Sequence, residues 1–265
     1  MCLIIIKENG KELVPNKMIS EVWTDNPHGA GIIFKRANSK RYQMIKGLMS
    51  EKELNQTIKK LNLSKNDFIA YHLRWATSGN LDAANTHPFI VHEDVGRVSA
   101  VKAESTDKTM FVMHNGVIHD LNDKKAKHSD TIRFVSEYMS QLSMNDLFKN
   151  ATVKSLIEKF IDGSRLFIAN NRYGHTMYGN WHEHEGYLIS KPYKDATKSS
   201  HYKNDFWYGG FERSFDNSFM SSQKSLFQEE NEWCDCCGIT NSSVKYNRNW
   251  NCYVCNDCKK DYMLS

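Results

Sequence analysis

The sequence predicts an α+β fold in which two β-sheets stack face to face between helices, followed by a small cysteine-rich domain. Across the first 190 or so residues, short apolar segments of strand length alternate with segments of helical period. Many of the strand-like segments are apolar on both faces, which is typical of sheets that are covered on both sides. Six of the seven cysteines lie between Cys234 and Cys258, which sets the C-terminal domain apart.

Strands are predicted where apolar runs are bounded by polar or turn-forming residues, and the first of them is the run Leu3-Ile4-Ile5-Ile6. In chain order, the predicted strands are residues 3–7, 31–35, 42–46, 68–73, 89–91, 110–114, 166–169, 177–179 and 187–190. Together with the helices between them, these strands are enough to form two sheets flanked by helices.

Helices are predicted between these strands, at residues 16–23, 50–61, 129–142 and 152–161. The second begins with Ser50 as its N-cap, and Glu53 follows three residues later in the register of a capping box. The third opens at Ser129 and places apolar residues from Ile132 to Leu142 at spacings of three and four, which buries one face.

Composition excludes several classes of protein. With 265 residues, 40% of them hydrophobic and 25% charged, the chain can bury one sizeable core and carry a small appendage. Its apolar runs are far shorter than the roughly 20 residues that cross a bilayer, and no signal-peptide pattern precedes them. We therefore expect a cytoplasmic protein without a membrane partner. A net charge of +4 is too small to argue for binding to a nucleic-acid backbone.

The composition changes after the last predicted strand. Residues 195–232 are rich in Ser, Lys, Asn and Asp, and their aromatic residues follow no clean period, which is typical of a connector. The sequence therefore predicts a first domain at residues 2–194, a polar and aromatic connector at 195–232, and a small domain at 233–265. Neither a GxGxxG motif nor a P-loop is present, so a nucleotide site of those types is not supported.

Cys2 follows Met1 directly, and removal of Met1 would give it a free α-amine beside its thiol. An α-amine titrates near pH 8, at roughly 7.7–8.0, so it can accept the thiol proton and later return it. A small residue in the second position usually permits this removal. The alternative is a buried structural cysteine at the start of an apolar strand.

Five further motifs follow Cys2 in a specific order: NPHGAG at 26–31, HLRWATSG at 72–79, NTHPF at 85–89, HNGVI at 114–118 and SDT at 129–131. With Cys2, they resemble the class II glutamine amidotransferases, whose nucleophile is an N-terminal cysteine. The resemblance covers residues 2–190. It implies a four-layer αββα sandwich of the N-terminal-nucleophile hydrolase type and L-glutamine as the substrate.

The resemblance also implies a role for each matching residue. Cys2 would attack the side-chain amide of glutamine. Arg74 matches the residue that grips the substrate α-carboxylate, for which its planar fork is suited, and Asp130 matches the one that meets the α-ammonium. Asn115, through its side-chain amide, and Gly116, through its backbone N–H, match the oxyanion hole.

Further positions match the wall of the glutamine pocket, namely Trp75, Thr77 and His87. His28 departs from the family pattern, since many relatives carry an acid before the glycine. The implied reaction needs no cofactor. It passes through a Cys2 thioester and releases glutamate and ammonia, and because no acceptor domain is recognisable, the ammonia would pass to a synthase or another separate protein partner.

Two alternatives stay open on the sequence. The first is a stand-alone amidohydrolase that acts on glutamine or other γ-glutamyl compounds. The second is a catalytically silent binding module that works through its C-terminal domain. The second is disfavoured because a degenerate copy should have lost at least one of the matching residues, which are Cys2, Arg74, Asn115, Gly116 and Asp130.

The C-terminal cysteines form two C-x2-C pairs separated by seventeen residues, a spacing typical of a zinc ribbon. The predicted ligands of one structural Zn²⁺ are Cys234, Cys237, Cys255 and Cys258. Cys236 or Cys252 is an alternative ligand, and clustered redox cysteines are the alternative interpretation. So small a domain needs the ion to fold. Zinc ribbons often bind nucleic acid, and this partner stays open, but the nearly balanced charge does not favour it over docking to a protein.

Overall fold

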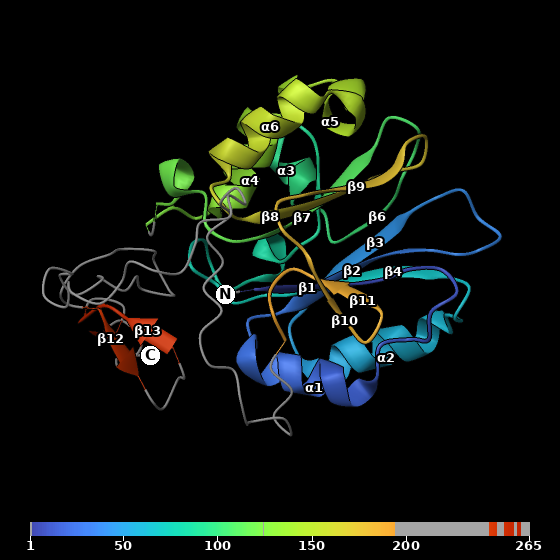
Figure 1. Ribbon diagram of the computed structural model, residues 1–265, viewed down its shortest axis with the longest axis horizontal. Coiled ribbons are helices and arrows are strands. Elements are labelled where there is room, and N and C mark those ends of the chain that lie inside the picture. Colours follow the sequence, from blue (N-terminus) through green and yellow to red (C-terminus); the bar gives the residue numbers. More distant parts are fainter. Residues whose placement is uncertain (1, 124, 194–243, 248–251, 257–258, 261–265) are drawn as a thin grey trace, which may run out of the picture. The chain divides into compact units, whose positions relative to one another are not determined.

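The structure is a computed structural model that describes residues 2–123, 125–193, 244–247, 252–256 and 259–260, the backbone alone for residues 246, 247, 252 and 253. The chain divides into two compact units, Met1–Pro192 and Tyr193–Ser265, and each is treated by itself below. The predicted mixture of helices and sheets is confirmed (Figure 1). Among the described residues, we find no helix with the length and apolar character that crossing a membrane requires.

The larger sheet of the first unit has seven strands, and each pairs antiparallel with its neighbours. In spatial order they are β10 (His182–His184), β11 (Tyr187–Ile189), β1 (Leu3–Lys7), β4 (Phe68–Leu73), β2 (Ala30–Lys35), β3 (Gln43–Leu48) and β6 (Lys102–Glu104). Strand β1 therefore lies inside the sheet, between β11 and β4, and is buried along its whole length. This position fixes the backbone immediately after Cys2.

The smaller sheet has four antiparallel strands, in the order β5 (Phe89–Ile90), β7 (Met110–Asn115), β8 (Arg165–Asn170) and β9 (Gly174–Tyr178). Side chains from both sheets meet in one apolar core, in which Ile4, Ile6 and Ile33 face Phe111 and Phe167. Because side chains alternate along a strand, Cys2 falls on the same face of β1 as Ile4 and points toward the space between the sheets.

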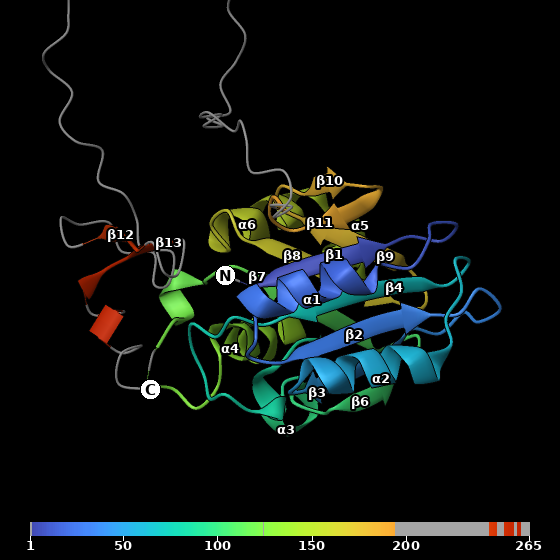
Figure 2. The same ribbon diagram turned by 90° about the horizontal axis from the view of Figure 1, so that it is seen from below.

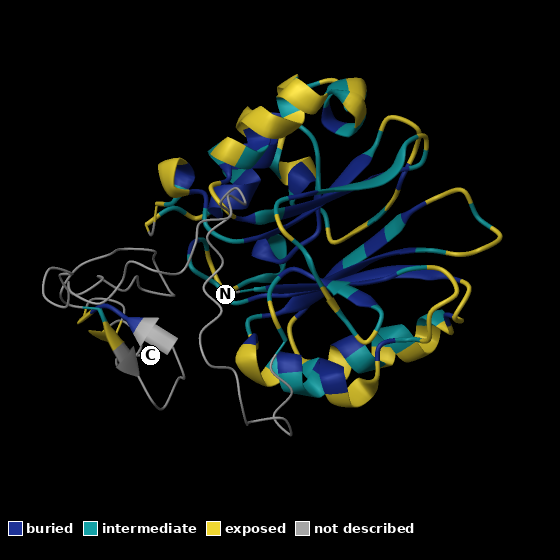
Figure 3. Cartoon of the chain, viewed as in Figure 1, coloured by how far each residue is buried: buried dark blue, intermediate teal, exposed yellow. Residues whose placement is uncertain are grey.

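Helices cover the outer faces of both sheets (Figures 1 and 2). The larger sheet is covered by α1 (Asn16–Asp25) and α2 (Glu51–Leu61), and the smaller by α3 (Val95–Val98), α4 (Asp130–Glu137), α5 (Met144–Lys149) and α6 (Ala151–Phe160). Short 3₁₀ turns complete the unit, at η1 (Ala83–Asn85), η2 (His119–Leu121) and η3 (Met139–Gln141). Each longer helix buries the side that faces its sheet and exposes the other (Figure 3).

Helix starts follow the predicted caps. Ser50 caps α2 by accepting a hydrogen bond from the Glu53 N–H, while the Glu53 carboxylate accepts from the Met49 N–H, one residue earlier than a standard capping box. Ser129 caps α4 in the same way. The predicted continuation of α4 to Leu142 is wrong, because the helix ends at Glu137 and the chain continues as η3.

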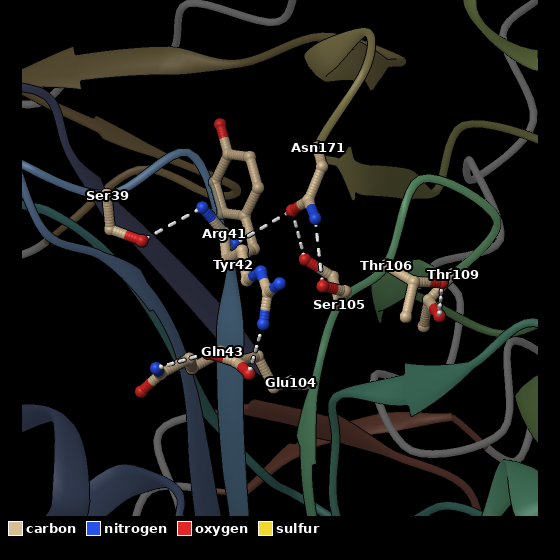
Figure 4. A network of polar contacts seen from close by, with 9 residues as sticks. All are labelled: Ser39, Arg41, Tyr42, Gln43, Glu104, Ser105, Thr106, Thr109 and Asn171. Atoms are coloured by element: carbon tan, nitrogen blue, oxygen red, sulfur yellow. Dashed lines mark hydrogen bonds and ion pairs between the residues drawn. The ribbon is translucent and has the colours of Figure 1, made fainter.

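The two sheets are joined by polar contacts at the end of the strands that lies away from Cys2. Figure 4 shows this network, which includes Tyr42, Ser105 and Asn171. The Asn171 side chain accepts a hydrogen bond from the Tyr42 N–H at 3.0 Å and donates to the Ser105 carbonyl at 2.8 Å. Beside it is a depression of about 430 Å³ lined by Arg41, Glu104, Ser105, Thr106, Asp107, Lys108 and Asn171. Because Cys2 lies at the other end of the strands, this depression is not part of the candidate site.

In the second unit, β12 (Lys245–Asn247) and β13 (Cys252–Val254) form an antiparallel hairpin. Cys255 directly follows β13 and is buried. The other predicted zinc ligands, Cys234, Cys237 and Cys258, lie outside the described residues, as do Cys236 and the predicted connector at 195–232.

Candidate active site

Cys2 lies at the start of β1 and is half-buried. The pairing of Leu3 with Leu73 places it opposite the loop that leaves β4. Its Sγ accepts a hydrogen bond from the Trp75 N–H at 3.3 Å and faces the Trp75 carbonyl oxygen at the same distance. The strand register and the backbone of Trp75 therefore hold the sulfur beside the segment that contains Arg74.

Arg74 is a buried cation within this segment, with 3% of its surface exposed. Its guanidinium donates hydrogen bonds to the Ser78 carbonyl at 2.8 Å and the Asn80 carbonyl at 2.9 Å. Burial lowers the pKa of Arg74, while negative charge on Cys2, Asp82 and Asp130 acts in the opposite direction. A guanidinium has five donors, so it can hold this loop and still bind an anion.

Asp130 is the first residue of α4 and is also buried. Its carboxylate accepts hydrogen bonds from the Ile118 N–H at 2.8 Å and the Thr131 N–H at 2.7 Å. Its own N–H donates to the Ser78 hydroxyl at 3.2 Å. Arg74 and Asp130 thus meet on one residue, Ser78, and this places a fixed cation and a fixed anion around the same loop.

Asn115 ends β7 and points toward β1. Its side-chain amide donates to the Ser190 hydroxyl at 2.8 Å, and the same hydroxyl accepts from the Ile4 N–H at 2.8 Å. Ser190 thereby links the Asn115 amide to the backbone of Ile4, which lies two residues after Cys2 in the chain. Sequence reasoning assigned no role to Ser190, which ends a predicted strand and carries no motif of its own.

Gly116 has a backbone that only glycine accepts here. Its φ is +147°, and a Cβ at this position would lie 1.9 Å from the Ser164 hydroxyl. The close approach of Ser164 and the positive φ together explain why the Asn-Gly pair ends β7.

The predicted pocket-wall residues differ in how deeply they are buried. Trp75 and Thr77 are half-buried on the loop after β4, and the Trp75 ring lies 4.9 Å from the ring of His28. His28 in turn accepts a hydrogen bond from the Ala76 N–H at 3.0 Å. His87 is more deeply buried, and its carbonyl oxygen would lie 2.0 Å from a Cβ at Gly31.

Three buried histidines lie in this region. The ring of His87 stacks 4.0 Å from that of His72, whose Nε2 donates to the His114 carbonyl at 2.9 Å. Burial lowers the pKa of His72 to about 3 and that of His114 to about 4, and it holds the pKa of His87 well below its ordinary value. All three are neutral at pH 7 and are weak proton acceptors, so they are poorly suited to activate a thiol.

Comparisons with known proteins were made on the whole chain, and no protein-family model matches it. Over 96 residues, the chain is 28% identical to the glutamine–fructose-6-phosphate aminotransferase (isomerizing) of Oceanobacillus iheyensis. This stretch is 36% of the chain and 13% of that protein, so the chain spans only a small part of the relative it matches.

Two solved structures resemble the chain weakly. One is glutamine phosphoribosylpyrophosphate amidotransferase from B. subtilis in complex with ADP and GMP, with a TM-score of 0.41 at 12% identity, covering 64% of this chain and 35% of that one. The other is an allosteric regulatory enzyme of purine biosynthesis, with a TM-score of 0.38 at 14% identity, covering 63% and 35%.

Proposed function

We propose that residues 2–194 form the glutaminase domain of a class II glutamine amidotransferase, with the four-layer αββα sandwich of N-terminal-nucleophile hydrolases. The observation that carries this proposal is the arrangement around the loop after β4. The Cys2 sulfur contacts the backbone of Trp75, the adjacent Arg74 binds this loop, and Asp130 meets Arg74 at Ser78. The similarity to a glutamine–fructose-6-phosphate aminotransferase supports the same conclusion.

Glutamine recognition needs one cation and one anion, because the free amino acid is a zwitterion with a neutral side-chain amide. Arg74 would bind the α-carboxylate through the donors that its loop contacts leave. Asp130 would bind the α-ammonium, since a carboxylate has about four acceptor sites and can keep its backbone partners. Trp75, Thr77 and His87 would shape the pocket around the aliphatic part of the substrate.

Catalysis would begin once Met1 is removed. The Cys2 α-amine takes the thiol proton and Sγ attacks the amide carbon of glutamine, which forms a tetrahedral intermediate with one new negative oxygen. Asn115 and Gly116 would donate hydrogen bonds to that oxygen. The C–N bond then breaks, ammonia leaves with a proton from the Cys2 amine, and a γ-glutamyl thioester remains. Water adds to the thioester carbon and releases glutamate, and the thiol is restored.

The ammonia would pass to an acceptor on a separate synthase or another protein partner. A stand-alone amidohydrolase of γ-glutamyl compounds is the alternative that kinetic data would favour if such compounds outcompete glutamine.

The decisive experiment measures ammonia release from L-glutamine by the purified chain and by Cys2→Ala and Cys2→Ser variants. We expect release by the wild type and loss of release in both variants, with circular dichroism spectra unchanged. Unchanged release in a folded Cys2→Ala variant would refute the mechanism. A wild type that cleaves γ-glutamyl dipeptides faster than glutamine would instead identify the stand-alone amidohydrolase.

The C-terminal unit is proposed to be a zinc ribbon in which Cys234, Cys237, Cys255 and Cys258 bind one structural Zn²⁺. The β12–β13 hairpin brings Cys255 to a buried position directly after a strand, and the Lys259 N–H donates to its carbonyl, which is compatible with a metal-binding turn. Metal analysis should find about one zinc per chain, and less in Cys255→Ser. A zinc-free chain whose C-terminal unit resists proteolysis as well as before chelation would contradict the ribbon.

A further inference from the structure

Lys46 is a buried cation on β3 that the proposed reaction does not use. Only 3% of its surface is exposed. Its Nζ donates a hydrogen bond to the Ala84 carbonyl at 2.9 Å and lies 4.2 Å from the centroid of the Phe89 ring. A desolvated ammonium is costly unless it is paired, so the burial of Lys46 against these two groups needs a structural or functional reason.

The contact with Ala84 involves the segment that carries η1, and the contact with Phe89 involves β5, which follows that segment. Next to Lys46, the Gly47 N–H donates to the Thr86 hydroxyl at 2.8 Å. Gly47 has a φ of +75°, and a Cβ there would lie 2.7 Å from the Cβ of Ala83, so only a glycine lets the segment approach so closely. Residues 82–87, which we name the η1 loop, are therefore held against the end of β3 by Lys46 and Gly47.

The far side of the η1 loop holds the start of α4. The Asn85 side-chain carbonyl accepts from the Ser129 N–H at 2.9 Å, and its amide donates to the Lys127 carbonyl at 3.2 Å. Ser129 is the N-cap of α4, and Asp130 follows it. A continuous set of contacts thus runs from Lys46 through the η1 loop to Asp130.

We propose that Lys46 is a positioning residue that fixes the η1 loop against β3 and so keeps Asp130 in place to bind the ammonium of the substrate. This role rests on the proposed glutaminase function. It acts through the η1 loop, since the Lys46 Nζ donates a hydrogen bond to the Ala84 carbonyl.

The protonation state of Lys46 makes this contact sensitive to pH. Burial lowers the pKa of Lys46 to about 7, with Asp82 opposing the shift and Arg74 adding to it, and the Lys46 charge in turn lowers the pKa of His87. The ammonium is present below pH 7, and the neutral amine replaces it above. Since burial disfavours the charged form, the packed loop accommodates the neutral amine better, and the hold on the η1 loop strengthens as the pH rises through 7.

Lys46→Met and Lys46→Arg test this role against a matched control. At pH 8, Lys46→Met should raise the KM for glutamine about tenfold, the scale of one lost buried hydrogen bond, with kcat within about twofold. The wild-type KM should fall between pH 6 and pH 8, whereas Lys46→Arg, which stays charged, should show no such fall across that range. Lys35→Met removes a lysine over the Tyr42 ring at the opposite end of the sheet and should leave KM unchanged.

A wild-type KM and pH profile in a folded Lys46→Met variant would overturn the proposal. Amide hydrogen exchange supplies a readout that does not depend on turnover. Exchange in residues 82–87 and 127–130 should be faster in Lys46→Met than in the wild type or Lys35→Met, and equal exchange would also overturn it. A wild type that releases no ammonia would refute the glutaminase function, while the exchange data would still decide whether Lys46 holds the loop.

Discussion

The Asn115 side chain is held in position before any substrate binds. The Ser190 hydroxyl accepts hydrogen bonds from both the Asn115 side-chain amide and the Ile4 N–H. An amide nitrogen has two N–H donors, so the bond to Ser190 leaves one donor for a developing oxyanion. A donor held in advance stabilises the transition state without a reorganisation cost. At the scale of single residues, this orientation is what the proposed mechanism most requires of the fold.

We predict that Asn115→Ala lowers kcat by about 10²–10³-fold, which is the typical effect of losing one oxyanion donor. Steady-state ammonia release measures it. Asn66→Ala, which removes the same amide from an exposed residue next to the opposite end of β4, is the matched control and should turn over normally. Full turnover in Asn115→Ala would remove the residue from the oxyanion hole.

The sequence identified the site residues that belong to motifs, but it did not reveal the residues that hold them in position. The structure places Cys2 and Arg74 at the same loop, and Asp130 reaches that loop through Ser78. The sequence could not reveal Ser190 or Lys46, since Ser190 bonds Asn115, 75 positions away, and Ile4, 186 positions away, and the burial of Lys46 depends on the η1 loop. Such contacts depend on strand register, which no local pattern contains.

At the scale of elements, the turn between β7 and η2 carries the tightest steric constraint near the candidate site. Gly116 combines a positive φ with the close approach of Ser164. Gly174, in the smaller sheet, also has a positive φ, of +78°, but a Cβ there would have no neighbouring atom within 4 Å. Substitution of these two glycines therefore distinguishes the effect of a positive φ, which both share, from the effect of a steric clash, which only Gly116 would have.

We predict that Gly116→Ala lowers turnover by about 10²-fold, because the displaced backbone N–H no longer meets the oxyanion. Gly174→Ala should lose only the roughly 1–2 kcal/mol that a side chain costs at positive φ, with turnover unchanged. Ammonia assays and urea unfolding of both variants provide the comparison. Equal turnover in the two variants would show that the Gly116 N–H takes no part.

Elements with a strong apolar period were predicted well and exposed ones were not. The predicted strand at residues 68–73 coincides with β4, which is buried throughout. Strands β6 and β10 were missed because their residues are mostly exposed or half-buried and show no apolar alternation. The early end of α4 is marked by a change to the i→i+3 hydrogen bonds of a 3₁₀ turn, from the Gln141 N–H to the Tyr138 carbonyl and from the Leu142 N–H to the Met139 carbonyl, each at 3.1 Å.

At the scale of the whole molecule, the neutral histidines link stability to pH. His72, His87 and His114 have pKa values lowered by burial, so the folded state binds fewer protons than the unfolded state below pH 6.5. The free energy of unfolding is therefore highest, as far as these histidines decide it, above pH 6.5, and it decreases as the pH falls toward 4. Lys46 adds the same sign of dependence at higher pH, because its own pKa is lowered to about 7.

We predict that the free energy of unfolding falls between pH 6 and pH 5 by about 1.4 kcal/mol per pH unit for each buried histidine. His87→Phe removes one such group and should show a correspondingly smaller slope in urea unfolding. His119→Ala, at an exposed position, should keep the wild-type slope. A pH-independent stability over this range would mean that the histidines bind protons equally in the folded and unfolded states.

The central claim concerns the first residue of the active chain, where a thiol and an α-amine must belong to the same cysteine. Intact-mass spectrometry of natively expressed protein that releases ammonia from glutamine tests this claim most directly. We predict a mass that corresponds to a chain beginning at Cys2. Full activity in protein that still carries Met1 would contradict the account.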